Sequence, residues 1–225
     1  MRIAVKFGHS MVDYPPKIES YKAAAQLLSS LVSQGHKLVV VVGGGPQARE
    51  YIQTAKTLGC DGAFRDLIGI EVTKLNARLL IAALGEKAYP KPAESVEELK
   101  SAVSSKDVVV MGGLTPGHST DAVAAIASEV MGADLFIKSM EVGGIYDSDP
   151  TKEPSAKLKE RVTYDELQKI VLRRSSTEAG DYSPLDLVAL EILRKSKAKV
   201  MFVGSRVEDI ERAVNGEKVG TLVVH

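Results

Sequence analysis

Three consecutive glycines, Gly43-Gly44-Gly45, follow a continuous apolar run and precede a stretch of helical spacing that carries Arg49. Glycine lets a backbone approach a phosphate group closely, and the first turn of a helix offers free N–H groups and the positive end of its dipole. The Arg49 guanidinium could then pair bidentately with phosphate oxygens. A tight strand-to-helix turn without a ligand is the simpler alternative, but three glycines exceed what such a turn needs. The pattern therefore favours phosphate binding.

Glycine also follows two other apolar runs, at Gly8 and at Gly112-Gly113. If these runs are parallel strands, their ligands lie beyond the carboxyl ends of the strands. Three glycine-bearing strand ends on one edge predict one long ligand site or two adjoining sites. Such a site suits a phosphoryl donor and an acceptor better than a single cofactor.

Lys6 ends the first apolar run, two residues before Gly8. A lysine at that place could reach a transferring phosphoryl group as a mobile point charge. A solvated lysine at a strand end is the usual outcome for this residue type. From its position alone, Lys6 fits both interpretations equally well.

Two further polar positions allow either a structural role or a binding role. In the segment 114–121, Thr120 or Asp121 could cap the next helix, or the loop's N–H groups and hydroxyls could line an acceptor phosphate or a base. Asp66 could cap the helix that it opens, or it could accept hydrogen bonds from ribose hydroxyls, as acidic residues do in nucleotide sites. The spacing leaves both alternatives open.

Neither histidine near these segments, His9 or His118, is assigned a role as a base. Phosphoryl transfer needs positioning and charge stabilisation more than a strong base. No run of histidines or carboxylates has the spacing of a fixed metal site, so we expect no metal ligands from the chain. Mg²⁺ is expected to arrive with ATP, held largely by phosphates and water.

These residues need a scaffold that brings strand ends together, and the hydrophobic pattern predicts one. Apolar runs typical of buried strands alternate with segments of helical spacing along the chain. The order predicts an α/β fold, a three-layer αβα sandwich with a mostly parallel central sheet, in a single domain over residues 1–225. Strands are predicted at 3–7, 37–42, 87–89, 107–111, 134–139, 199–203 and 220–224, and helices at 17–35, 47–58, 66–84, 95–104, 120–131, 164–171, 185–196 and 207–215.

Composition narrows the class of partner. Lys plus Arg equals Asp plus Glu at 29 each, so no basic excess indicates nucleic acid and no acidic excess indicates disorder. The single cysteine, Cys60, precludes an intrachain disulfide and a Cys-based metal site, which fits a reducing cytosol. No apolar run has the form of a signal segment or approaches the ~20 residues of a membrane span. We therefore expect a cytoplasmic protein that binds neither nucleic acid nor membranes.

Several motifs occur in a characteristic order along nearly the whole chain. Their order and spacing together resemble the amino-acid-kinase superfamily and, within it, the archaeal branch of UMP kinases. The motifs are Lys6-Phe-Gly8, Gly43-Gly-Gly-Pro-Gln-Ala-Arg49, Asp66-Leu-Ile-Gly-Ile70 with Asn76, Gly112-Gly-Leu-Thr-Pro-Gly-His-Ser-Thr-Asp-Ala-Val-Ala-Ala125, Gly144-Ile-Tyr-Asp-Ser-Asp-Pro150, and Ala179-Gly-Asp-Tyr182 followed by Leu185-Asp186.

The resemblance implies a kinase that transfers the γ-phosphoryl group of ATP reversibly to UMP in pyrimidine nucleotide biosynthesis, with Mg²⁺, in a hexamer built as a trimer of dimers. It implies an acceptor side over roughly 1–130 and an ATP side over roughly 131–225. Lys6 and Arg49 would be catalytic, and Asp66 would bind the UMP ribose. The implied ATP contacts are Lys6, Gly8, His9, Ser10, Gly45, Arg49, Tyr146 and Asp149; the implied UMP contacts are Gly44, Asp66, Leu114, Thr115, Pro116, Gly117, His118, Ser119 and Thr120.

Two segments depart from the family pattern, and both concern the ATP contacts more than the UMP contacts. His9 stands where the family usually has glycine, and residues 140–144 read Met-Glu-Val-Gly-Gly where polar and acidic side chains are usual. Two alternatives remain: a kinase of the same superfamily that acts on an amino-acid carboxylate or an alkyl phosphate, and a nucleotide-binding regulator without turnover. A Rossmann-type redox enzyme is excluded, because no G-x-G-x-x-G follows the first strand.

Overall fold

The central sheet has seven strands, and all but one pair of neighbours are parallel. A computed structural model describes residues 1–8, 15–175 and 184–224 of the chain. The strands run in the spatial order β3-β2-β1-β4-β6-β7-β5, and only β6 and β7 pair antiparallel. They are β1 (Arg2–Lys6), β2 (Lys37–Val41), β3 (Val108–Met111), β4 (Leu135–Ser139), β5 (Arg161–Thr163), β6 (Lys199–Val203) and β7 (Thr221–Val224).

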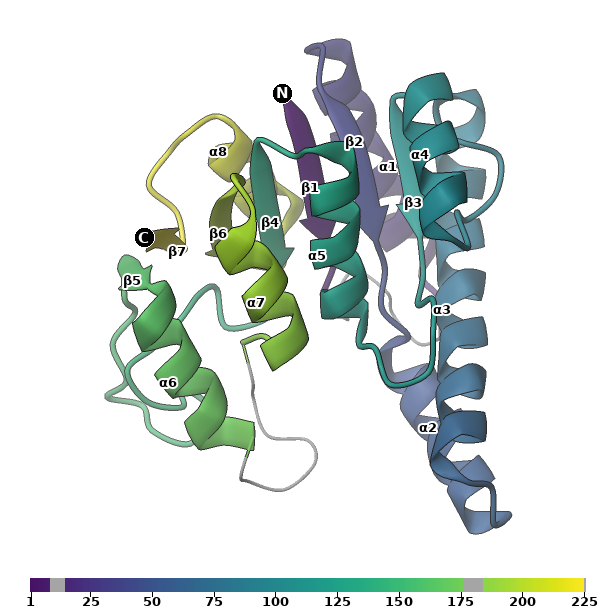
Figure 1. The fold of residues 1–225 in the computed structure, drawn as a ribbon. Coiled ribbons are helices and arrows are strands. Elements are labelled where there is room, and N and C mark those ends of the chain that lie inside the picture. The colour runs from purple at the N-terminus through teal and green to yellow at the C-terminus, as the bar shows by residue number, and fades with distance from the viewer. Residues whose placement is uncertain (9–14, 176–183, 225) are drawn as a thin grey trace.

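Helices cover both faces of this sheet, as Figure 1 shows. On one face lie α4 (Val96–Ser105), α5 (Thr120–Met131), α6 (Tyr164–Ser175) and α7 (Leu187–Lys195). On the other face lie α1 (Ile18–Ser33), α3 (Gly62–Leu84) and α8 (Val207–Val214), while α2 (Gly45–Thr57) packs against α3. The predicted three-layer αβα sandwich with a mostly parallel sheet is confirmed.

Alternation along the central strands divides the core into two apolar layers. In β2, Val39 and Val41 face the layer under α4 and α5, while Leu38 and Val40 face the layer under α1 and α3. Successive side chains of a strand point to opposite faces, so a strand covered on both sides must be apolar throughout. This requirement explains the unbroken valine run from which the strand was predicted.

Two predicted elements need correction, and one strand was not predicted. The helix expected from residue 66 begins at Gly62, because the Asp61 side chain caps it by accepting a hydrogen bond of 2.8 Å from the Phe64 N–H. The strand expected at 87–89 is absent from the described chain: a 3-10 turn, Gly85–Lys87, leads to a single bridge between Ala88 and Val108. The short β5 was not predicted, since its three residues are too few to show an alternating pattern.

Within the described part of the chain, we find no helix long and apolar enough to cross a membrane.

Candidate active site

The glycine-bearing ends of β1, β2 and β3 lie side by side, because these strands are parallel neighbours in the sheet. Close packing explains why glycine occupies these ends. A Cβ on Gly112 would lie 2.5 Å from Oγ1 of Thr73 and 2.9 Å from the Lys74 nitrogen, and a Cβ on Gly44 would lie 2.3 Å from Cβ of Ala48. The Ala48 side chain of α2 and the backbone of α3 at Thr73 and Lys74 therefore lie too close to these glycines for any larger residue.

A cavity of about 770 Å³ opens at the ends of β1, β2 and β4. No side chain of the described chain caps the N-terminus of α2, which faces this cavity through Gly44 and Gly45. Free N–H groups of this kind are suited to anionic oxygen. The cavity collects Lys6, Gly8, Gly45, Arg49 and Asp149 from the predicted ATP set.

Three other members of that set are not placed in this cavity. Tyr146 is partly buried and forms a bridge with Leu158, and it is not among the residues that line the cavity. His9 and Ser10 lie outside the described residues.

A second cavity of about 360 Å³ adjoins the first and lies between α2, α3 and the loop after β3. The two cavities share Gly44, Ser119 and Thr120. Of the two predicted alternatives, one long site or two adjoining sites, this arrangement corresponds to the second. Of the predicted UMP contacts, the smaller cavity collects Gly44, Asp66, Gly117, His118, Ser119 and Thr120, whereas Leu114, Thr115 and Pro116 line neither cavity.

Asp66 positions the loop that separates β3 from α5. Its Oδ2 accepts a hydrogen bond of 2.8 Å from the Gly117 N–H. In the described part of the chain its other oxygen, Oδ1, has no donor. Because Asp61 caps α3, the capping alternative for Asp66 is wrong, and its carboxylate lies at the smaller cavity instead.

Ser119 caps α5, so the capping alternative for Thr120 and Asp121 is wrong. Its Oγ accepts hydrogen bonds of 3.0 and 3.1 Å from the N–H groups of Asp121 and Ala122. The same hydroxyl donates to Asp186, which itself caps α7 by accepting from the Ala189 N–H at 2.9 Å. The cap at Ser119 leaves the side chains of Thr120 and Asp121 facing the larger cavity.

Lys6, Asp121 and Lys138 form a buried charge cluster on one wall of the larger cavity. Lys6 and Lys138 are register partners on β1 and β4, and they are only 6% and 8% exposed. The Lys6 ammonium donates a hydrogen bond of 2.6 Å to the Phe7 carbonyl and lies 3.9 Å from Oδ1 of Asp121. The Lys138 ammonium donates to the other oxygen of Asp121, Oδ2. One carboxylate therefore holds two ammonium groups side by side.

This cluster shifts the titration of its members. Burial lowers the pKa of Lys6 to about 8; the Asp121 charge raises it and the Lys138 charge lowers it further. Burial alone would raise the pKa of Asp121, but the charges of Lys138 and Lys6 outweigh that effect and lower it. Asp121 is therefore anionic, and Lys6 is a cation that loses its proton as the pH rises through about 8.

Residues 1–204 match the family model described as the amino acid kinase family. The chain belongs to the amino acid kinase family. A uridylate kinase of Hyperthermus butylicus is 46% identical over 98% of this chain and 97% of that protein. Another, of Methanothermobacter thermautotrophicus, is 44% identical over 100% of this chain and 99% of its own length.

Solved structures of this family share the whole architecture. The crystal structure of a uridylate kinase from Archaeoglobus fulgidus superposes with a TM-score of 0.86 at 37% identity, and covers 99% of both chains. A UMP kinase from Bacillus anthracis has a TM-score of 0.80 at 22% identity, over 99% of this chain and 95% of its own, and so supports the fold alone.

Sequence reasoning missed Lys138 and Thr73 as residues of this amino acid kinase site, and it included Asn76 in a motif without assigning it a role. Lys138 stands one residue before the end of β4, and nothing local indicates that it meets Lys6, because the pairing of β4 with β1 brings them together. On α3, Asn76 donates to the Gly43 carbonyl at 2.9 Å, and Thr73 Oγ1 accepts from the Gly113 N–H at 2.6 Å. These two polar side chains hold the glycine-bearing strand ends in place.

The described residues contain no group of three or more His, Cys, Asp or Glu side chains that could hold a metal ion. The acidic side chains that line the larger cavity are Asp121, Glu141 and Asp149, and Asp121 is already paired with two lysines. This set fits a Mg²⁺ ion that keeps most of its ligands on phosphate and water, since Mg²⁺ is commonly held by one or two carboxylates plus substrate phosphates.

Proposed function

We infer that this chain is a uridylate kinase that transfers the γ-phosphoryl group of ATP to UMP, giving ADP and UDP. The observation that carries this inference is the pair of adjoining cavities that meet at Gly44, Ser119 and Thr120. Two ligands in these cavities would approach each other over a phosphate-binding helix N-terminus. The full-length similarity to curated uridylate kinases supports UMP as the acceptor.

ATP is proposed to occupy the larger cavity, with its phosphates over Gly8, Gly45 and Arg49. UMP is proposed to occupy the smaller cavity, with its ribose hydroxyls at the Asp66 carboxylate and its phosphate directed to Gly44 and Thr120. Within the described chain Oδ1 of Asp66 has no donor, which supports this orientation. It can accept a hydrogen bond from a ribose hydroxyl while Oδ2 keeps its hydrogen bond from the Gly117 N–H. The family roles assigned to His9 and Ser10 remain part of this proposal.

In the proposed step, a phosphate oxygen of UMP forms a bond to the γ-phosphorus as the bond from that phosphorus to the β,γ-bridging oxygen breaks. The developing negative charge lies on the transferring group and on the ADP leaving group. Lys6 and Lys138 would neutralise that charge from one wall of the cavity, and Arg49 would do so from α2. Asp121 would hold both ammonium groups in place before the substrates bind.

Mg²⁺ bound to the ATP phosphates would supply further neutralisation of the same oxygens. Asp149 and Glu141 line the larger cavity, and their carboxylates would contact this ion or its water ligands. Glu141 adds a carboxylate to this segment, whereas the acidic side chain usual in the family is missing at Gly143.

The remaining features are proposed from the family. The acceptor side would span roughly residues 1–130 and the ATP side roughly 131–225. The protein would act in the cytoplasm in pyrimidine nucleotide biosynthesis, as a homo-oligomer, and the expected assembly is a hexamer formed as a trimer of dimers.

The test is a coupled assay for ADP release with ATP and Mg²⁺. The acceptors are UMP, CMP, dUMP, N-acetylglutamate, aspartate and isopentenyl phosphate. Turnover with UMP above all others is expected. Turnover with a different acceptor would overturn the Asp66 assignment, and nucleotide binding without turnover would indicate a regulator.

A further inference from the structure

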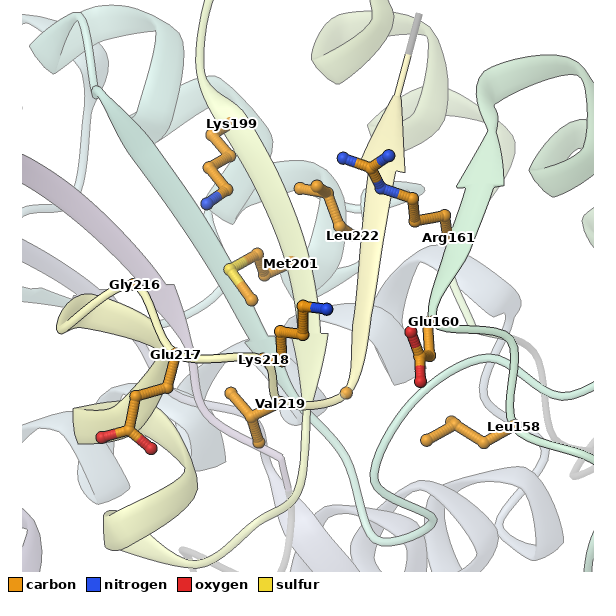
Figure 2. A pocket seen from close by; sticks show the side chains of 11 residues that line it. Leu158, Glu160, Arg161, Lys199, Met201, Gly216, Glu217, Lys218, Val219 and Leu222 are labelled. Atoms are coloured by element: carbon orange, nitrogen blue, oxygen red, sulfur yellow. The ribbon is translucent and has the colours of Figure 1, made fainter.

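A third cavity, of about 460 Å³, lies on the sheet face beyond α8. Figure 2 shows its lining side chains on β6, β7, β5 and the connection that leads into β7. None of its lining residues belongs to the two cavities of the proposed active site. It is therefore a separate hollow that the phosphoryl-transfer proposal does not use.

The strand register explains how this cavity obtains its floor. Met201 pairs with Leu222 across the antiparallel β6–β7 ladder, and Leu222 pairs with Arg161 across the parallel β7–β5 ladder. Partners in register point to the same face, and so does Lys199, two residues before Met201. On this face α8 packs on β4 and β6, so the hollow lies over the outer strands.

Three cationic side chains surround that floor. In Figure 2 the guanidinium of Arg161 and the ammonium groups of Lys199 and Lys218 lie around Leu222 and Met201. Among the residues that the structure describes, none of the three cations has an ion-pair partner. The two carboxylates that line the cavity do not neutralise these three cations. Glu217 is paired with Arg212 at 2.8 Å, which leaves Glu160 as the other acidic lining residue.

The floor itself is apolar and closely packed. Met201 is 4% exposed, and Leu222 and Val219 are partly buried members of the layer under α1 and α8. A cavity of this size falls within the range of small-molecule sites, about 300–1,000 Å³. Inorganic phosphate alone would leave the apolar floor uncovered, and an uncharged ring would leave the cations unpaired.

We propose that this cavity is a second binding site for an organic phosphate with an aromatic body, such as a nucleoside phosphate. The phosphate lies against Arg161, Lys199 and Lys218, and the ring system covers Met201 and Leu222.

The walls of this cavity also hold the loop that contributes Asp149 to the larger cavity. Thr221, which follows the lining residue Gly220, accepts the Ile145 N–H at 2.8 Å and donates to the Lys159 carbonyl at 2.6 Å. Lys159 in turn donates its N–H to the Ile145 carbonyl at 2.8 Å. A ligand that braces segments 158–161 and 218–222 therefore stabilises the start of this loop.

The test is residue-resolved acetylation of lysines, measured by mass spectrometry at low conversion. The probes are ADP and 1-naphthyl phosphate, and the comparison compounds are inorganic phosphate and 1-naphthol. We expect acetylation of Lys199 and Lys218 to slow on the order of fivefold when a probe is present at about four times its dissociation constant. Lys197 is exposed but lies outside the cavity, so its rate should not change. This readout requires no turnover and is independent of the proposed function.

The Arg161→Gln variant should lose this protection while Lys197→Gln keeps it, and both substitutions are at exposed side chains.

Hydrogen exchange across residues 144–149 should slow with 1-naphthyl phosphate in the wild type. Unchanged exchange would overturn the coupling of the cavity to the loop. Equal acetylation rates with and without the probes, or equal protection by inorganic phosphate, would overturn the proposed site. So would protection that follows protein concentration alone, which would make this face an interface between copies of the chain.

Discussion

The ammonium group of Lys6 lies 3.9 Å from Oδ1 of Asp121, at the point where the end of β1 meets the start of α5. Both side chains line the larger cavity, and the Lys6 side chain is buried. An ammonium group held in this way has lost most of its water before any ligand binds. It therefore interacts strongly with phosphate oxygens and needs little reorganisation when negative charge develops.

Replacing Lys6 by alanine should lower kcat by about 10²–10³-fold and change the dissociation constant of UMP much less. The physical reason is that its charge is needed most in the transition state, while UMP is bound mainly in the other cavity. Steady-state kinetics together with UMP binding would measure the two effects, with the exposed Lys22→Ala as the control. Retention of turnover in the Lys6 variant would remove it from the catalytic machinery.

The lowered pKa of Lys6 predicts a basic limb in the pH profile. Its pKa is about 8 in the free protein, so the charged form is lost as pH rises through that value, and kcat/KM for ATP should fall above it. Bound phosphates favour the ammonium form, so the limb in kcat should lie at higher pH. Because the Asp121 charge raises the pKa of Lys6, Asp121→Asn should move the kcat/KM limb to lower pH. A limb unmoved by that substitution would belong to a different group.

The sequence predicted the elements well where local signals agreed. Helix α5 has the bounds predicted for it, because a polar start, an alanine-rich apolar face and Gly132 in the left-handed region coincide. The start of α3 was missed because Gly62 resembles a helix breaker, although Asp61 before it is a good N-cap. Local propensity could not decide between these two signals; the packing of α3 on α1 and α2 does.

The site was predictable to the extent that glycine and strand ends define it. The adjacency of Gly8, Gly43 and Gly112 follows from parallel pairing of β1, β2 and β3. The charge cluster was not predictable in the same way, since Lys138 meets Lys6 only because β4 pairs with β1. Strand order is a property of the whole fold, and a charged residue at a strand end is usually solvated, so Lys138 carried no local signal.

Asp66→Asn should raise KM for UMP by roughly 10–100-fold and leave KM for ATP nearly unchanged, which is the range expected for loss of a hydrogen bond to a charged group. Asparagine can still accept the Gly117 N–H, so the loop should stay in place and the loss should come from the ribose contact. The matched control is Glu50→Gln at an exposed position on α2. Equal increases for both substrates would contradict the assignment of Asp66 to the ribose.

Gly112→Ala should lower the free energy of unfolding by about 1–3 kcal/mol, as overpacking commonly does. The added Cβ would lie 2.5 Å from Oγ1 of Thr73 and 2.9 Å from the Lys74 nitrogen, so α3 must move away from β3. Gly62→Ala is the matched control, because a Cβ there comes no closer than 3.8 Å to its nearest neighbour, the Arg65 side chain. Denaturant unfolding measures both variants. An unchanged stability for Gly112→Ala would show that the strand end tolerates a side chain.

Ser119→Ala should lower the free energy of unfolding by about 0.5–2 kcal/mol through loss of the N-cap of α5. The hydroxyl also donates a hydrogen bond to Asp186, the N-cap of α7, so its removal breaks the hydrogen bond that joins the caps of α5 and α7. A double-mutant cycle of Ser119→Ala with Asp186→Ala distinguishes loss of the N-caps from loss of the hydrogen bond between them. If only the caps mattered, the two losses in the free energy of unfolding would be additive. We expect a coupling energy of about 0.5–3 kcal/mol between the two positions. Additive losses would mean that the α5 and α7 caps act independently. In that case the acceptor loop would be positioned from α3, through Asp66, without help from α7.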